Sequence, residues 1–254
     1  MGLCGRRLRL GPGAASSGVL GISPELQSAA PRGLDRSAEG WQASAMQLNT
    51  PDTITAAFTR PEGFRFARWA QPIAPMIYGL DPASTNLMKA GLHLICDLTN
   101  HPYEDTDPVA GYNHVTLHCA DWAELRDVPP LGPGIDNAKL AEELTERDLP
   151  RHLVFWFDDQ GAIIRALHLV RVDHALAELP ADLLAIIHAM MAHLHWGPSA
   201  FESGTTQDGP HGAQIRADLL DLLRAAYDRS IPAASSDPSL ALRLAARLQI
   251  GRGD

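Results

Sequence analysis

Apolar residues recur with a regular period from about residue 61 to about residue 229, whereas the first 45 residues show no such period. The segment 64–80 is apolar, but Pro72 and Pro75 interrupt it, and proline cannot donate a hydrogen bond to a neighbouring strand. We therefore expect an irregular or edge strand there. Asp81 followed by Pro82 is typical of a helix start, and the helix is expected to run to about Thr99. Its apolar face is predicted to contain Leu87, Gly91, Leu94, Ile95 and Leu98.

The segment His114–Cys119 alternates in the manner of a strand that is buried on one side. Its alternation predicts Val115, Leu117 and Cys119 on the inner face and His114, Thr116 and His118 on the outer face. A polar helix over 136–147 follows after a proline-rich connector.

Two strongly apolar segments, 152–157 and 162–172, lie on either side of the turn Asp158–Gly161 and predict a β-hairpin. Both faces of the first segment are apolar, which predicts a central strand. Helices are expected over 180–195, 214–227 and 238–249. Helices grouped after a partly antiparallel sheet indicate an α+β fold with a mixed or antiparallel sheet and helices packed on it.

This pattern divides the chain into three regions. Residues 1–45 are expected to be a disordered tail, or a mis-assigned start that precedes the true start at Met46. An organellar transit peptide is the alternative, because the segment is rich in arginine and serine and poor in acids. Residues 46–230 are predicted to form a single α+β domain. Residues 231–254 are predicted to contain a peripheral amphipathic helix, in which Leu244→Ala would cost less than about 1.5 kcal/mol.

Composition narrows the classes of partner. The net charge is −9, and Lys89 and Lys139 are the lysines of the chain, so nucleic acid is not expected as a partner. The apolar run 183–194 is shorter than the roughly 20 residues that a membrane helix needs. Cys4, Cys96 and Cys119 show no metal or disulfide spacing and are typical of free thiols in a cytoplasmic protein. With nucleic acid and membrane not expected, the predicted partner is an unidentified protein or small molecule.

The helix expected at 181–195 contains His188, His193 and His195 and therefore invites comparison with a metal-binding helix. His188 and His193 are five residues apart, so they point about 140° apart around the helix axis and cannot hold one ion. Ala189 stands where a metalloprotease would carry its glutamate base. We therefore predict no bound metal and no cofactor.

Catalytic candidates are few. His168 shares its strand face with apolar residues, so it is either a hydrogen-bonded core histidine or a catalytic one. The residues that could build an unfamiliar active site are His168, His188, Asp107 and Glu202. Their convergence in one pocket would indicate an enzyme. The sequence otherwise favours a non-catalytic binding or interaction domain.

Four segments carry a resemblance to known proteins: 65–75, 104–108, 121–125 and 157–163. Together they resemble a set of uncharacterised bacterial proteins of unknown function, which implies no particular chemistry. The Arg68-Trp69 strand, the hairpin and the following helix are also similar in order to zincin-like domains. Because the helix lacks the zincin metal motif, this second resemblance implies a relative without peptidase activity.

Overall fold

The computed structural model describes residues 47–105, 111–172, 180–209 and 212–250. These residues pack as two compact units. Unit 1 is Trp69–Ala192, and unit 2 contains the described residues up to Arg68 together with those from His193 onward. Among the described residues, no helix is long and apolar enough to cross a membrane.

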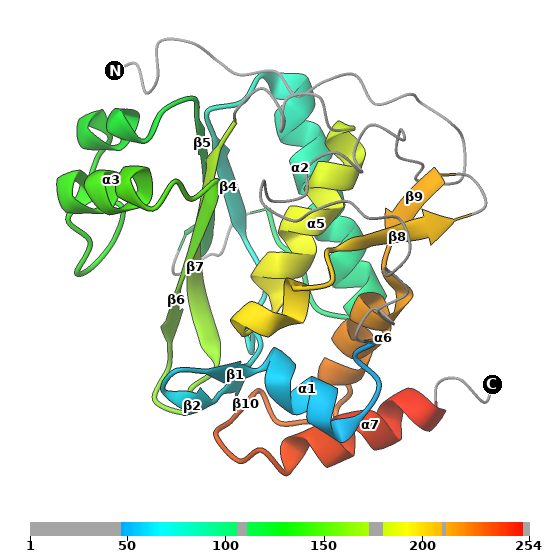
Figure 1. Cartoon of the computed structure of the whole chain (residues 1–254). Coiled ribbons are helices and arrows are strands. Elements are labelled where there is room, and N and C mark those ends of the chain that lie inside the picture. Colours follow the sequence, from blue (N-terminus) through cyan, green and yellow to red (C-terminus); the bar gives the residue numbers. More distant parts are fainter. Residues whose placement is uncertain (1–46, 106–110, 173–179, 210–211, 251–254) are drawn as a thin grey trace, which may run out of the picture. The chain divides into compact units, whose positions relative to one another are not determined.

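Unit 1 is built on a mixed four-stranded sheet with the order β4-β5-β7-β6 (Figure 1). The strands are β4 (Pro75–Tyr78), β5 (His114–Cys119), β6 (Arg151–Phe157) and β7 (Ile163–Arg171). β4, β5 and β7 run parallel, and β6 pairs with β7 as the predicted hairpin. This arrangement confirms the α+β class and the mixed sheet.

The position of β6 differs from the prediction. It is an edge strand whose residues are all half-buried, and β5 and β7 are the central strands of the sheet. The apolar residues on both faces of β6 suggested full coverage. One side of the strand, however, has no neighbour among the described strands, which leaves both faces partly open.

Helices cover both faces of the sheet in unit 1 (Figure 1). The helices α2 (Pro82–Thr99) and α5 (Ala181–His193) lie on one face, where Met88, Ala181 and Leu184 pack against Val170 of β7. The 3₁₀ helix η2 (Trp122–Asp127) and the helix α3 (Asn137–Glu146) lie on the other. α3 lies within the predicted polar helix 136–147, and Asp136 is its N-cap.

The start of α2 is as predicted, because Asp81 accepts hydrogen bonds from the N–H groups of the first turn. Its buried face is rotated from the predicted one. The side chains of Leu87 and Leu94 are 40% and 48% exposed, and the buried residues are Ser84, Met88, Gly91, Leu92, Ile95, Cys96 and Thr99. Gly91 belongs to both the predicted and the buried face, and a Cβ atom there would lie 2.7 Å from the carbonyl carbon of Ala185. The absence of a side chain at Gly91 therefore allows the close approach of α2 to α5.

β5 is buried on both faces, which corrects a second prediction. Val115, Leu117 and Cys119 belong to the face that η2 and α3 cover. His114, Thr116 and His118 were expected to face solvent, but each is at most 2% exposed. A strand in the interior of a sheet with helices on both sides has no solvent face, whatever its alternation.

Unit 2 contains short elements from both ends of the described chain. They are α1 (Pro51–Ala57), β1 (Thr59–Arg60), β2 (Gly63–Phe64), β3 (Phe66–Ala67), η3 (Pro198–Phe201), β8 (Thr206–Gly209), β9 (Gly212–Ile215), α6 (Ala217–Ala226), β10 (Ala234–Ser235) and α7 (Leu240–Ile250). The strands form the pairs β1-β2, β3-β10 and β8-β9. α1, β8 and β9 were not predicted from the sequence.

The terminal helix α7 is not peripheral in unit 2. It packs on α1 and α6, and its buried residues are Leu240, Ala241, Leu244, Ala245 and Leu248. α6 is in turn tied to the start of the described chain, because the carboxylate of Asp218 accepts hydrogen bonds from Arg216 and from the backbone N–H of Leu48. The low cost expected for Leu244→Ala is therefore revised below.

Candidate functional site: a buried histidine cluster

Three histidines of unit 1 meet between the sheet and α5, and they are called the histidine cluster here: His118, His168 and His188. β5 contributes His118, the neighbouring strand β7 contributes His168, and α5 contributes His188. The strand register pairs Thr116 with His168 and His118 with Val170, so both strand histidines face α5. None of the three side chains is more than 2% exposed.

His188 contacts both strand histidines. The ring centroids of His168 and His188 are 4.7 Å apart, with the ring planes at 60°. Those of His118 and His188 are 5.9 Å apart, with the planes at 31°. His114, on the same face of β5, packs its ring edge-on to Trp69 at 6.4 Å and is buried to the same degree.

Hydrogen bonding defines the tautomer of His118. Its Nδ1 lies 3.3 Å from the backbone oxygen of Tyr78. A carbonyl oxygen can only accept, so Nδ1 carries the proton and Nε2 carries a lone pair. This pattern is common in metal-binding histidines, whose second nitrogen donates to a carbonyl or carboxylate.

The remaining nitrogens of the cluster lack partners. Within the described residues, Nε2 of His118 and both ring nitrogens of His168 and His188 are buried without a hydrogen bond. Leaving a buried polar group unsatisfied costs about 1–3 kcal/mol. A group that binds these nitrogens would remove this cost.

All three histidines are neutral at pH 7. Burial lowers the pKa of His118 to about 4. Burial also lowers the pKa values of His168 and His188 well below the usual range. The neighbouring histidines and the charge of Arg151 lower both pKa values further. The neutral imidazole is the form that binds a metal ion.

Arg151 is the charged group beside the cluster. It is the first residue of β6, and it shares a sheet face with Leu153, whose register partner is His168. Its Nη1 donates to the sulfur of Met191 at 3.0 Å, and Met191 lies one helical turn beyond His188 on α5. Burial lowers the pKa of Arg151. Among the described residues, no carboxylate forms an ion pair with it.

The ring nitrogens do not yet converge. In the conformation described here, no three histidine, cysteine or carboxylate side chains of the described residues are placed to hold a metal ion. The histidine cluster is therefore a group of contacting neutral imidazoles rather than a preformed coordination sphere.

The structure brings together two of the four predicted candidates, His168 and His188. Asp107 lies outside the described residues. Glu202 is an exposed residue of unit 2 at the end of η3. His193, which the sequence excluded as a metal partner of His188, belongs to unit 2, where its backbone carbonyl accepts a hydrogen bond from Tyr227.

His118 and Arg151 were not predicted as site residues from the sequence. The alternation of β5 placed His118 outside, and Arg151 precedes the predicted strand. One signal was present: the helix 181–193 is apolar on most of its surface, which is typical of a buried helix. A buried helix would have implied a covered strand face beneath it.

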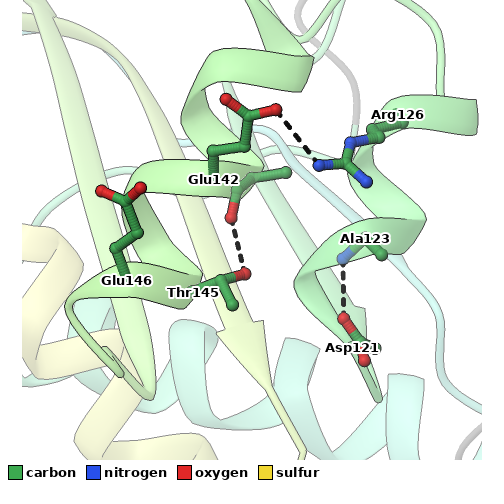
Figure 2. Close-up of a pocket in the computed structure, with 7 residues that line it drawn as sticks. Asp121, Ala123, Arg126, Glu142, Thr145 and Glu146 are labelled. Atoms are coloured by element: carbon green, nitrogen blue, oxygen red, sulfur yellow. Dashed lines mark hydrogen bonds and ion pairs between the residues drawn. The ribbon is translucent and has the colours of Figure 1, made fainter.

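Unit 1 also has a hollow of about 230 Å³ between η2 and α3 (Figure 2). Most of its polar groups serve local structure. Asp121 caps η2 by accepting from Ala123, Thr145 donates to the backbone oxygen of Ala141, and Arg126 pairs with Glu142 at 3.3 Å. Glu146 lines the same hollow. We assign no chemistry to it, since these partners already satisfy the groups that could act.

Comparison of the chain with protein-family models, curated proteins and solved structures finds no match.

Proposed function

We propose that unit 1 binds a transition-metal ion such as Zn²⁺ through Nε2 of His118 and one ring nitrogen each of His168 and His188. The supporting observation is that the ring of the fully buried His188 contacts the buried rings of His118 and His168, and that Nε2 of His118 and both ring nitrogens of His168 and His188 lack hydrogen-bond partners. Imidazole nitrogen is a preferred ligand of zinc, copper and nickel. Three neutral imidazoles would leave a fourth position open.

The ring spacing suits a shared ion. A Zn–N distance of about 2.0–2.1 Å and a tetrahedral angle place the centroids of two bound imidazoles about 5 Å apart. The observed distances of 4.7 and 5.9 Å lie on either side of this value. Binding then requires the rings to turn about their Cβ–Cγ bonds, a torsion with a broad range in histidine.

This proposal retains the non-catalytic binding domain expected from the sequence and replaces the expectation of no metal. The proposed ligands come from two strands and one helix, so they do not depend on the zincin helix motif that the chain lacks. A distant relationship to zincin-like domains remains a separate proposal. It is supported by the order of the Arg-Trp segment, the hairpin and α5.

The test is a titration of the full chain with Zn²⁺ after treatment with a chelator. We expect one ion per chain and a rise in melting temperature with metal concentration. At a free metal concentration one hundred times Kd, binding would stabilise the folded state by about 2.7 kcal/mol. Co²⁺ in place of zinc should give the absorption bands of a four-coordinate site.

Substitution tests the ligands. His118→Gln, His168→Gln and His188→Gln should each weaken metal binding by at least tenfold, since glutamine is a poor ligand for zinc. His152→Gln is the matched control, because His152 is a half-buried histidine of β6 on the opposite face of the sheet. A folded protein that takes up no metal would refute the proposal. A loss as large in His152→Gln as in the cluster variants would refute the assignment of ligands.

A further inference from the structure

The sheet of unit 1 has two edges whose strands differ in their residues (Figure 1). β4 forms one edge, is four residues long and begins at Pro75, which cannot donate a hydrogen bond to a further strand. β6 forms the other edge, is seven residues long and contains no proline or lysine. Natural sheets protect their edge strands with such residues or with a bulge, because an unprotected edge can pair with another strand. The irregularity in the β6-β7 pairing leaves the extra residue, Ile164, in β7, so β6 itself keeps a regular alternation.

The backbone of β6 is oriented to bond on its outer side. The N–H of Arg171 in β7 donates to the backbone oxygen of Pro150, the residue before β6. In an antiparallel ladder, the backbone groups of successive residues point alternately toward one neighbour and toward the other. The even-numbered residues of 151–157 therefore direct their N–H and C=O groups to β7. The odd-numbered residues direct theirs to the outer side, where no described strand lies.

We propose that β6 pairs antiparallel with β6 of a second copy of this chain, with Val154 of the two copies opposite each other on a two-fold axis. In this register all seven residues of β6 pair, and the two four-stranded sheets join into one continuous sheet. Leu153 then lies opposite Phe155 of the second copy, an aliphatic–aromatic pair that stabilises antiparallel strands. The proposal explains why β6 is apolar on both faces, as a central strand is, although its residues are only half-buried in one copy.

The charges at the two ends of β6 favour a second copy as the partner. β6 begins with Arg151 and is followed directly by the exposed Asp158 and Asp159 of the turn. Antiparallel pairing places the basic start of each strand beside the acidic turn of the other, so the attraction occurs at both ends of the pair. A parallel pair would bring like charges together. A two-fold axis also closes the assembly at a dimer, whereas pairing without closure would continue into a fibre.

The experiment measures the mass of the full, metal-free chain by sedimentation equilibrium over a range of protein concentrations, so its outcome is independent of the proposed function. We expect a reversible equilibrium between monomer and dimer. Asp159→Arg replaces attraction by repulsion at both ends of the pair and should raise the Kd of the dimer at least fivefold. Asp97→Arg is the matched control, because Asp97 is an exposed acid of α2, which packs on the opposite edge strand β4. It should leave the Kd unchanged.

A cysteine substitution tests the register. Residues that face each other in a non-hydrogen-bonded antiparallel pair have Cα atoms about 4.5 Å apart, a distance that a disulfide can bridge. Val154→Cys should therefore form a disulfide-linked dimer under mild oxidation. Val115→Cys is the matched control, because Val115 is a half-buried valine on the same face of the sheet but in the interior strand β5. The wild-type chain, with its own Cys4, Cys96 and Cys119, gives the background of cross-linking.

Two outcomes would refute the pairing of β6 with a second copy. One is a wild-type chain that stays monomeric at every concentration. The other is a dimer that Asp159→Arg does not weaken and in which Val154→Cys cross-links no more than Val115→Cys, because such a dimer would form through another face. Circular dichroism of each variant shows that its fold is retained, so a loss of dimer is not mistaken for unfolding.

Discussion

Truncation of Leu244 in α7 tests whether the C-terminal helix belongs to the core of unit 2. The side chain of Leu244 is 0% exposed and lies on the face of α7 that packs on α1 and α6. Leu→Ala substitutions in cores cost about 2–5 kcal/mol, because apolar contact is lost and a cavity remains. With full burial, we expect Leu244→Ala to cost at least 2 kcal/mol, out of roughly 5–15 kcal/mol for a whole domain.

Leu242 provides a matched control on the same helix. Its side chain is 60% exposed, so Leu242→Ala should change the free energy of unfolding by less than about 0.5 kcal/mol. Both values come from urea unfolding followed by circular dichroism, with the slope of the transition compared between variants. Equal costs for the two substitutions would refute the packing described for α7 and restore the prediction of a peripheral helix.

Three further predictions concern burial elsewhere. Burial lowers the pKa of His114 to about 4, so between pH 6.5 and 4 the unfolded chain binds a proton at this residue that the folded chain does not. His114 alone should account for about 2 kcal/mol of the stability that the metal-free protein loses at pH 5 relative to pH 7.5, in addition to the contributions of the other buried histidines. His114→Gln should remove that part of the loss in urea titrations at the two pH values. Gly91→Ala should destabilise the protein by about 1–3 kcal/mol despite the better helix propensity of alanine, because the new methyl group would overlap Ala185; an unchanged melting temperature would contradict this. Asp218→Asn should cost about 3–5 kcal/mol by leaving the buried guanidinium of Arg216 without its 2.6 Å partner, and a thermal shift near zero would show that the pair is dispensable.

Local signals in the sequence predicted the elements that local chemistry determines. Asp81 with Pro82 located the start of α2, and the turn Asp158–Gly161 located the hairpin. The polar segment 136–147 located α3. Gly161 has φ +86°, a conformation that glycine adopts readily. Each of these features depends on residues within one or two turns of the chain.

The histidine cluster could not be predicted in the same way. The exposure of His118 depends on coverage by α5, which begins more than 60 residues later in the chain. Helix α1 was missed for a different reason: Thr50 and Thr53 form a capping box and Pro51 is the first helical residue, but the segment is short and has few apolar residues. Strands β8 and β9 were missed because polar residues gave no alternation.

The strand order of unit 1 has a consequence for when the histidine cluster can exist during folding. The hairpin β6-β7 joins residues close in the chain and can form early, whereas β5 must pair with β7 across a long loop. Pairing between distant segments forms slowly, because the chain loses loop entropy before it gains contacts. His118 and His168 therefore come together only after β5 has docked on β7, and His188 joins when α5 covers them. A ligand of all three histidines would therefore bind the completed sheet and not the early hairpin. It would stabilise unit 1 only after β5, β7 and α5 have packed together.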